Sequence, residues 1–203
     1  MPKTLKIGIT GGIGVGKSVI TLIFKQLGIP IYDADSRAKW LITHHAQLVE
    51  AIILNFGKEA YLANGELNRR YLAEKVFVSS DKTQLMNSLV HPKVGEDSQD
   101  WFAKNEGKFP YVLKEAALLY ESGGYKELDK IIVVTAPLAI RIERIKARDT
   151  QRSEAEILGI ISKQMPEDEK IRRADFLIHN DGNQPIIPQV LHLHHQLLAL
   201  GVA

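Results

Sequence analysis

Short apolar runs alternate along this chain with longer stretches of helical periodicity. Residues 5–10 (Leu-Lys-Ile-Gly-Ile-Thr) and 130–135 (Lys-Ile-Ile-Val-Val-Thr) are apolar and rich in β-branched side chains, which is typical of buried parallel strands. Further runs predict strands over residues 29–32, 111–119 and 174–178. Because strands that alternate with helices build parallel sheets, the pattern predicts an α/β fold with a parallel β-sheet core flanked by helices.

The segment from residue 36 to residue 105 has helical periodicity without a strand pattern, so we expect a helical subdomain inserted in the α/β core. Its apolar spacing predicts helices over residues 36–54, with a break near His44 and His45, and over residues 67–77 and 79–89. Pro92 disfavours helical backbone at the residue before it. His91 is therefore expected at a corner, where filling a gap is favoured over facing a cleft.

A glycine-rich loop follows the first predicted strand. Residues 11–18 fit the pattern G-x-x-x-x-G-K-[ST], and residues 19–27 continue with helical spacing, which is the context of a P-loop. Glycines let backbone N–H groups approach phosphate, the lysine supplies charge for the β- and γ-phosphates, and the serine supplies a hydroxyl for Mg²⁺. The residues expected to bind nucleotide are Gly12, Ile13, Gly14, Val15, Gly16, Lys17 and Ser18, with Ser18 as the metal ligand.

Charged residues after later strands extend this candidate site. Asp33 follows the second strand, and we favour a role as base toward a phosphoryl acceptor over that of a turn residue. Glu115 lies either near the metal or on the outer face of its strand. Arg141, Arg144 and Arg148 share one stripe of a helix. Beside a P-loop, a lid that clamps phosphate is favoured over a solvated surface helix.

Composition narrows the class of protein. The 203 residues carry a net charge of +2, so no nucleic-acid or membrane partner is expected. The chain has no cysteine, which excludes disulfides and zinc–thiolate sites. No apolar run approaches the roughly 20 residues of a transmembrane helix, and the first strand begins too early for a signal peptide. We therefore expect a soluble cytoplasmic protein, and no oligomeric state is predicted.

The motifs, taken in order, resemble the dephospho-CoA kinase family over nearly the whole chain. The P-loop alone would indicate only nucleotide binding, whereas the combination is far more specific. The matching segments are 7–18, Asp33-Ala34-Asp35, 89–94 (Leu-Val-His-Pro-Lys-Val), 118–121 (Leu-Leu-Tyr-Glu), Arg144 with Ala147-Arg148-Asp149, Gln164, and 174–180 (Ala-Asp-Phe-Leu-Ile-His-Asn).

The resemblance implies transfer of the ATP γ-phosphate, with Mg²⁺, to the ribose 3′-hydroxyl of dephospho-CoA, giving CoA and ADP in the last step of CoA biosynthesis. It also implies a P-loop kinase core, a helical CoA-binding subdomain and a lid. In this single domain of residues 1–203 we place the core at about 1–35 and 108–203, the substrate subdomain at about 36–107 and the lid at about 138–172.

Site roles follow from the same resemblance. It implies that Asp33 is the general base, that Arg144 and Arg148 are lid arginines, and that Asn180 lies near the adenine of ATP. His91 becomes a substrate-side residue on this ground alone, and Lys17, Arg144 and Asp33 form the expected catalytic set.

The chain departs from the family pattern at three places. Glu115 replaces the usual aspartate and Ala117 the usual proline, so a metal or substrate contact by Glu115 is an open expectation. Ile160 stands where the family usually has a second lid arginine. Arg141 stands where the family often has glutamine, and we hypothesise that it compensates for the missing arginine.

The sequence is also compatible with other functions. The nearest is another small P-loop kinase acting on a nucleoside, nucleotide or shikimate-like acceptor. A GTP-dependent switch is disfavoured because the chain has no Asn-Lys-x-Asp segment. A catalytically silent homologue is disfavoured because Lys17, Ser18, Asp33 and Arg144 are all present.

Overall fold

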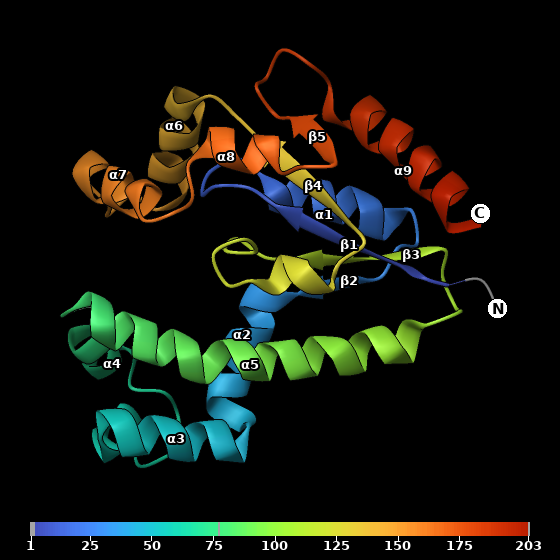
Figure 1. The fold of residues 1–203 in the computed structure, drawn as a ribbon. Coiled ribbons are helices and arrows are strands. Elements are labelled where there is room, and N and C mark those ends of the chain that lie inside the picture. Colours follow the sequence, from blue (N-terminus) through green and yellow to red (C-terminus); the bar gives the residue numbers. More distant parts are fainter. Residues whose placement is uncertain (1–2, 77, 203) are drawn as a thin grey trace. The chain divides into compact units, whose positions relative to one another are not determined.

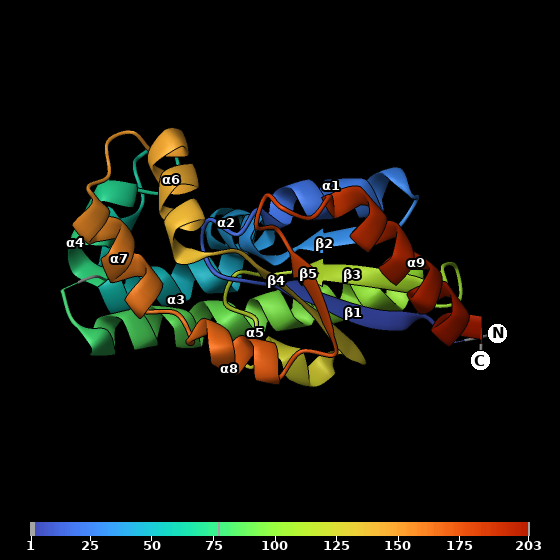
Figure 2. The ribbon, with the colours of Figure 1, turned by 90° about the horizontal axis from the view of Figure 1, so that it is seen from above.

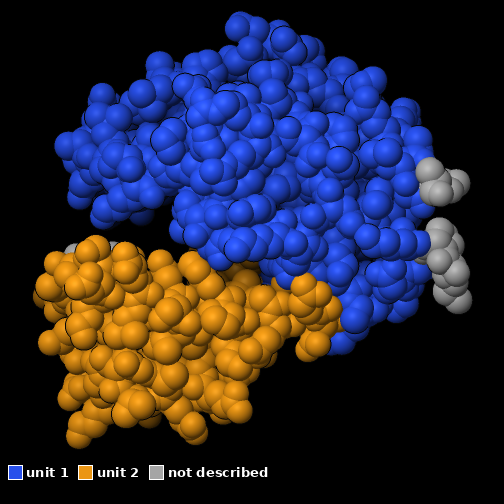
Figure 3. Space-filling view, in the orientation of Figure 1, with its two compact units in different colours: residues 1–33, 102–203 blue, residues 34–101 orange. Residues whose placement is uncertain are grey.

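The computed structural model describes residues 3–76 and 78–202. The chain forms two compact units, one of residues 1–33 and 102–203 and one of residues 34–101 (Figure 3). Each unit has its own hydrophobic core.

The first unit is built on a five-stranded sheet of order β2-β3-β1-β4-β5 (Figure 1). All four neighbouring pairs are parallel, which confirms the predicted α/β fold. The strands are β1 (Leu5–Thr10), β2 (Ile31–Asp33), β3 (Tyr111–Glu115), β4 (Lys130–Thr135) and β5 (Phe176–His179).

Two helices, α1 (Lys17–Gln26) and α9 (Ile186–Val202), join one face of the sheet in a single core cluster (Figures 1 and 2). Phe24 of α1 meets Tyr111 of β3 edge-to-face, with the ring centroids 6.4 Å apart. On the other side of β1, a Cβ at Gly8 would lie 2.6 Å from Leu128 Cδ1. Glycine is therefore needed at this strand position for close packing.

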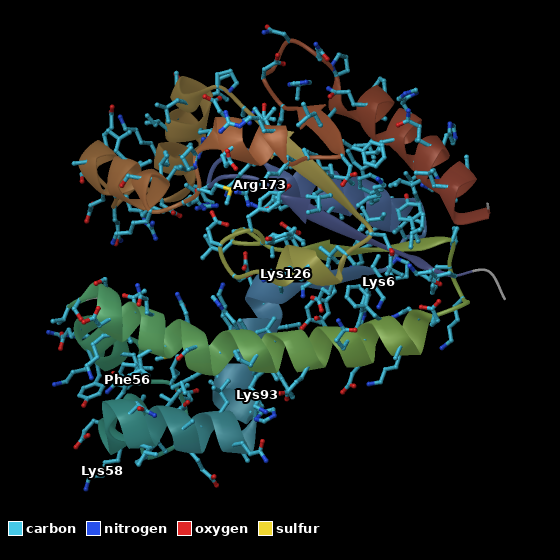
Figure 4. All side chains as sticks on the ribbon, viewed as in Figure 1. Lys6, Phe56, Lys58, Lys93, Lys126 and Arg173 are labelled. Atoms are coloured by element: carbon cyan, nitrogen blue, oxygen red, sulfur yellow. The ribbon has the colours of Figure 1, made fainter. Side chains whose placement is uncertain are left out.

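The remaining elements of this unit follow the third and fourth strands. They are the short 3-10 helix η2 (Gly124–Glu127) and the helices α6 (Leu138–Arg148), α7 (Glu154–Ser162) and α8 (Glu167–Arg172). Ser153 and Glu156 form a capping box at the start of α7. Near the start of β1, the Lys6 ammonium lies 5.0 Å from the centre of the Phe102 ring (Figure 4).

The second unit is helical, as predicted for this part of the chain. It contains α2 (Ala34–His44), α3 (Ala46–Phe56), the 3-10 helix η1 (Lys58–Ala60), α4 (Arg69–Val76) and the larger part of α5 (Ser80–Asn105). The predicted helix over residues 67–77 corresponds to α4, and its last position, Phe77, lies outside the described residues. The core of the unit consists of Leu41, Leu48, Ile52, Phe56, Ala60, Leu72, Val76 and Val90.

The predicted corner at His91 is wrong, because α5 runs through Pro92 without interruption. Proline inside a helix costs roughly 3 kcal/mol, so other contacts must hold the two halves in line. Before the proline, Val90 is buried in the core of the unit. After it, Asp97 accepts two hydrogen bonds from Arg37 of α2, at 2.8 and 2.6 Å. Tertiary packing thus overrides the local preference of Pro92.

None of the helices within the described part of the chain is both long enough and apolar enough to cross a membrane.

Candidate active site around the glycine-rich loop

The glycine-rich loop connects β1 to α1 in the first unit. Gly14 and Gly16 have φ values of +85° and +87°, a region that favours glycine over other residues. Gly16 is the N-cap of α1 and provides no side-chain cap. The first-turn N–H groups therefore need other acceptors, which makes this helix end suitable for an anion. Lys17 Nζ donates a hydrogen bond to the Gly11 carbonyl oxygen at 2.9 Å.

The glycines are packed closely by two later segments of the unit. A Cβ at Gly12 would lie 2.3 Å from Arg141 Nη2, and a Cβ at Gly14 would lie 2.7 Å from the Arg141 carbonyl oxygen. At Gly16 the nearest atom would be Nδ2 of Asn180, at 2.4 Å. The loop therefore has its shape partly because α6 and the residue after β5 occupy the space that side chains would fill.

Arg144 and Asn180 meet at the carbonyl group of Val15. Asn180 is buried, and its Nδ2 donates to the Val15 oxygen at 2.8 Å. Arg144 donates from Nη2 to Asn180 Oδ1 at 3.1 Å and from Nη1 to the same Val15 oxygen at 3.5 Å. A guanidinium group thus lies against the loop, where it can interact with phosphate charge.

The three arginines predicted to share one stripe have different surroundings. Arg141 is only 4% exposed, which contradicts the solvated-helix alternative for this residue. The Arg148 side chain is 63% exposed and pairs with Asp149 at 3.0 Å. This hydrogen bond raises the pKa of Arg148 above its usual value. The stripe is therefore divided between a buried inner end and an exposed outer end.

Two carboxylates lie side by side where β2 and β3 end. Asp33 and Glu115 are register partners in the parallel sheet, and Glu115 is also the partner of Ile9 near the end of β1. Asp33 is exposed and Glu115 is half-buried. The carboxyl ends of parallel strands are where ligands of such sheets bind. The structure thus places both acids and the start of the glycine-rich loop at the same edge of the sheet.

Ser18 is exposed in the first turn of α1, directly after Lys17. Within residues 3–76 and 78–202 there is no group of three or more His, Cys, Asp or Glu residues that could hold a metal ion. Mg²⁺ does not require such a cage, because it is usually bound by one or two protein oxygens, waters and substrate phosphates. The hydroxyl of Ser18 and the carboxylates at the strand ends fit that mode of binding.

Two residues in the α7–α8 region that bond the loop or Arg141 were not predicted as site residues from the sequence. Gln164 Oε1 accepts from the Ile13 N–H at 2.9 Å. Glu167 Oε2 accepts from Arg141 Nη1 at 2.6 Å. Gln164 is one of the positions that carry the family resemblance, so the sequence did contain a signal that this residue belongs to the site. Glu167 carried none, since it stands among several charged residues.

A buried lysine forms an ion pair beside this region. Lys170, in α8, is 2% exposed, and its Nζ lies 3.0 Å from Glu121 Oε1. The same carboxylate accepts from the Met165 N–H at 2.7 Å. Burial raises the pKa of Glu121, but the backbone N–H groups of Met165 and Glu121 and the charge of Lys170 together outweigh burial and hold the pKa below its usual value. The segment of residues 166–173, which is mostly charged, is thus anchored to the rest of the unit.

His91 lies in α5, within the second unit. It is half-buried, and burial lowers the pKa of its imidazole below the usual value. The neutral form of the ring is therefore favoured there.

Comparison with known proteins identifies the family. The family model for dephospho-CoA kinase matches residues 5–185. A dephospho-CoA kinase from Bacteroides fragilis is 39% identical over 189 residues, which are 93% of this chain and 91% of that protein. The crystal structure of TT1252 from Thermus thermophilus is 29% identical, with a TM-score of 0.79 and 97% of both chains covered. The structure of dephospho-CoA kinase from Campylobacter jejuni is 26% identical, with a TM-score of 0.69, covering 96% of this chain and 97% of that one. The chain therefore belongs to the dephospho-CoA kinase family.

Proposed function

We propose that this chain transfers the γ-phosphate of ATP to the ribose 3′-hydroxyl of dephospho-CoA, giving CoA and ADP in the last step of CoA biosynthesis. The observation that carries the proposal is the family match over residues 5–185, which contains the glycine-rich loop, the paired carboxylates and Asn180. The arrangement at the end of the sheet supports it, because phosphoryl transfer depends chiefly on positioning and on electrostatic stabilisation of phosphate charge.

The phosphate groups of ATP would bind to the loop. We assign their contacts to the backbone N–H groups of Gly12, Gly14, Gly16, Lys17 and Ser18, and to the Lys17 ammonium. Val15 keeps its expected place in this set, because it is its carbonyl and not its N–H that accepts from Asn180. Ile13 would hold the loop, because its N–H donates to Gln164. Lys17 would exchange its bond to Gly11 for phosphate oxygens.

Mg²⁺ would be held by the Ser18 hydroxyl together with phosphate oxygens, with Glu115 as a candidate outer partner. A bound Mg²⁺ neutralises charge on the β- and γ-phosphates. This assignment is supported by the exposure of Ser18 at the start of α1 and by the carboxylate at the end of β3.

Asp33 would accept the proton of the 3′-hydroxyl as that oxygen attacks the γ-phosphorus, and the leaving β-phosphate oxygen would depart as ADP. Arg144 would stabilise charge on the transferring group. Arg148 would contact the phosphates from the exposed end of the same helix. Asn180 would lie near the adenine of ATP and would also hold the loop through its bond to Val15. His91 and Glu115 are proposed on the substrate side.

The acceptor is tested by comparing substrates. Purified protein, ATP and Mg²⁺ would be incubated with dephospho-CoA and, in parallel, with nucleosides, nucleotides and shikimate, and products would be identified by mass. We expect phosphorylation of dephospho-CoA with a kcat/KM at least about 100-fold above every other acceptor, since a site that hydrogen-bonds its substrate rejects poorly matched ones. Preferential phosphorylation of a nucleoside or of shikimate would overturn the proposal.

A further inference from the structure

Both backbone polar groups of Ile13, in the glycine-rich loop, are bonded to side chains from the α6–α8 region. The N–H donates to Gln164 Oε1 at 2.9 Å, and the carbonyl oxygen accepts from Arg141 Nε at 3.0 Å. The two partners approach from positions 151 and 128 residues away in the sequence. A loop residue with both backbone groups paired in this way has little freedom to change its peptide orientation.

Arg141 is itself fixed. Its Nη1 donates to Glu167 Oε2 at 2.6 Å, and Glu167 Oε1 accepts from the Ala136 N–H, just after β4, at 3.3 Å. The side chain is almost fully buried, so its charge depends on this carboxylate for compensation. With Nε and Nη1 both used, moving the guanidinium would break two charge-assisted hydrogen bonds.

The guanidinium also occupies the space above Gly12. A Cβ at that position would lie 2.3 Å from Nη2 and 2.8 Å from Cζ of Arg141. The φ of Gly12 is not in the left-handed region, so its backbone alone does not require glycine. Glycine is therefore required at position 12 because the Arg141 guanidinium occupies the space that a side chain would fill.

Gln164 is held on the other side of Ile13. It follows the end of α7, and its N–H donates to the Ile161 carbonyl oxygen at 3.1 Å. The next residue, Met165, donates its N–H to Glu121, which also pairs with buried Lys170. The amide oxygen of Gln164 is thus presented to the loop by an anchored segment.

We propose that Arg141 and Gln164 are positioning residues that fix Ile13, and with it the glycine-rich loop, in the conformation that binds the phosphates of ATP. This inference rests on the proposed function, because it assumes that the loop holds ATP. It gives Arg141 a different role from the sequence-based hypothesis that Arg141 compensates for the arginine missing at Ile160.

The two roles of Arg141 differ in their effect on ATP and ADP. A loop that is less well positioned loses affinity for both nucleotides alike, because the loop cradles phosphates that ADP retains. A side chain that touches the γ-phosphate affects ATP alone. We would therefore measure the Kd of ATP and of ADP by calorimetry for Arg141→Met, using Arg144→Gln for comparison. We expect Arg141→Met to weaken both by about tenfold with an unchanged ratio, as expected for the loss of one or two hydrogen bonds.

Gln164 offers a matched pair of variants. Gln164→Leu removes the acceptor for the Ile13 N–H, whereas Gln164→Glu keeps an oxygen at that position. We expect Gln164→Leu to raise the KM for ATP about tenfold with kcat changed less than about threefold, and Gln164→Glu to restore most of the affinity. The melting temperatures of both variants would be recorded. A general structural defect would lower kcat together with the melting temperature and would count against the proposal.

A double-mutant cycle between Gly12 and Arg141 tests whether the two positions act together on ADP binding. Gly12→Ala should weaken ADP binding in the wild-type background, because the new methyl group displaces the pinned guanidinium. In an Arg141→Met background the same change should add less than about twofold, since the flexible methionine end can move aside. Equal effects in the two backgrounds would overturn the proposal.

The positioning role of Arg141 and Gln164 can be tested separately from the proposed kinase reaction, because the binding of ADP and ATP is measured without an acceptor. Failure to phosphorylate dephospho-CoA with these binding effects intact would reject the acceptor and keep the positioning role. Loss of ATP affinity with unchanged ADP affinity in Arg141→Met would reject the positioning role, as would equal ATP affinity in Gln164→Leu and Gln164→Glu.

Discussion

At the scale of single residues, the number of donors that an arginine has left decides what it can do at the loop. Arg141 uses Nε and Nη1 on Ile13 and Glu167, whereas Arg148, at the exposed end of the helix, bonds its neighbour Asp149. Arg144 lies between them and contacts Asn180 and the loop. We therefore expect the same residue type to serve loop positioning, charge stabilisation and a solvent-facing role within one helix.

A pH-dependence of stability follows from His91. Burial lowers the pKa of its imidazole below the usual value of about 6.5. The unfolded chain therefore binds a proton more readily than the folded chain, and the stabilising contribution is present above about pH 6.5 and is lost as the pH falls toward the folded-state pKa. We expect His91→Gln to reduce the fall in free energy of unfolding between pH 7.5 and 5.5, measured by urea titration. An unchanged fall in the variant would contradict this account.

Sequence reasoning located the loop residues but not all their partners. The glycine pattern and Lys17 form a motif with a fixed spacing, so their place between a strand and a helix could be predicted and is confirmed. The bond between Arg141 and Glu167 could not be predicted, because a pair 26 residues apart meets only once α6 and α8 have packed. The buried Lys170 is a similar case, since its sequence neighbours are mostly charged.

At the scale of elements, the hydrophobic pattern located all five strands, although it extended the third to residue 119 whereas β3 ends at Glu115. It predicted the long helix poorly. Residues 130–135 form β4 over the predicted range, because a continuous apolar run between helices leaves few alternatives. The end of α5 was misjudged at Pro92, where a local steric rule was weighed without the packing of Val90 and the pairing of Asp97 with Arg37. Local conformational preferences predict structure least reliably where contacts with residues distant in the sequence favour a different conformation.

The free-energy cost of Pro92 within α5 can be measured. Pro92 is exposed within α5, and we expect Pro92→Ala to raise the free energy of unfolding by about 2 kcal/mol, which is the cost of roughly 3 kcal/mol for an internal proline less about 1 kcal/mol for the stiffer unfolded chain. Gly95→Ala is the matched control in the same helix, since a Cβ there would meet nothing within 4 Å, and its expected gain is about 1 kcal/mol. A gain from Pro92→Ala no larger than that of Gly95→Ala would contradict the account.

At the scale of the whole molecule, the sheet order explains why distant residues form one site. The central strand β1 lies between β3 and β4, so its loop is next to Glu115 on one side and to the segment that follows Thr135 on the other. β2 then places Asp33 beside Glu115. Sequence could predict a parallel sheet but not this order, which sets the neighbours of the loop. The helical unit folds around a separate core, and the glycine-rich loop lies in the first unit.

The most direct test of the account compares CoA formation by the wild-type chain and by Asp33→Asn, with the ATP Kd measured on the same samples. We expect the wild-type chain to form CoA carrying the new phosphate on the ribose 3′-oxygen. Asp33→Asn should bind ATP with unchanged affinity and form CoA at least about 100-fold more slowly, because a positioned base contributes about 10²–10⁴-fold. Wild-type protein that binds ATP without forming CoA, or an Asp33→Asn variant that turns over at the wild-type rate, would contradict the account.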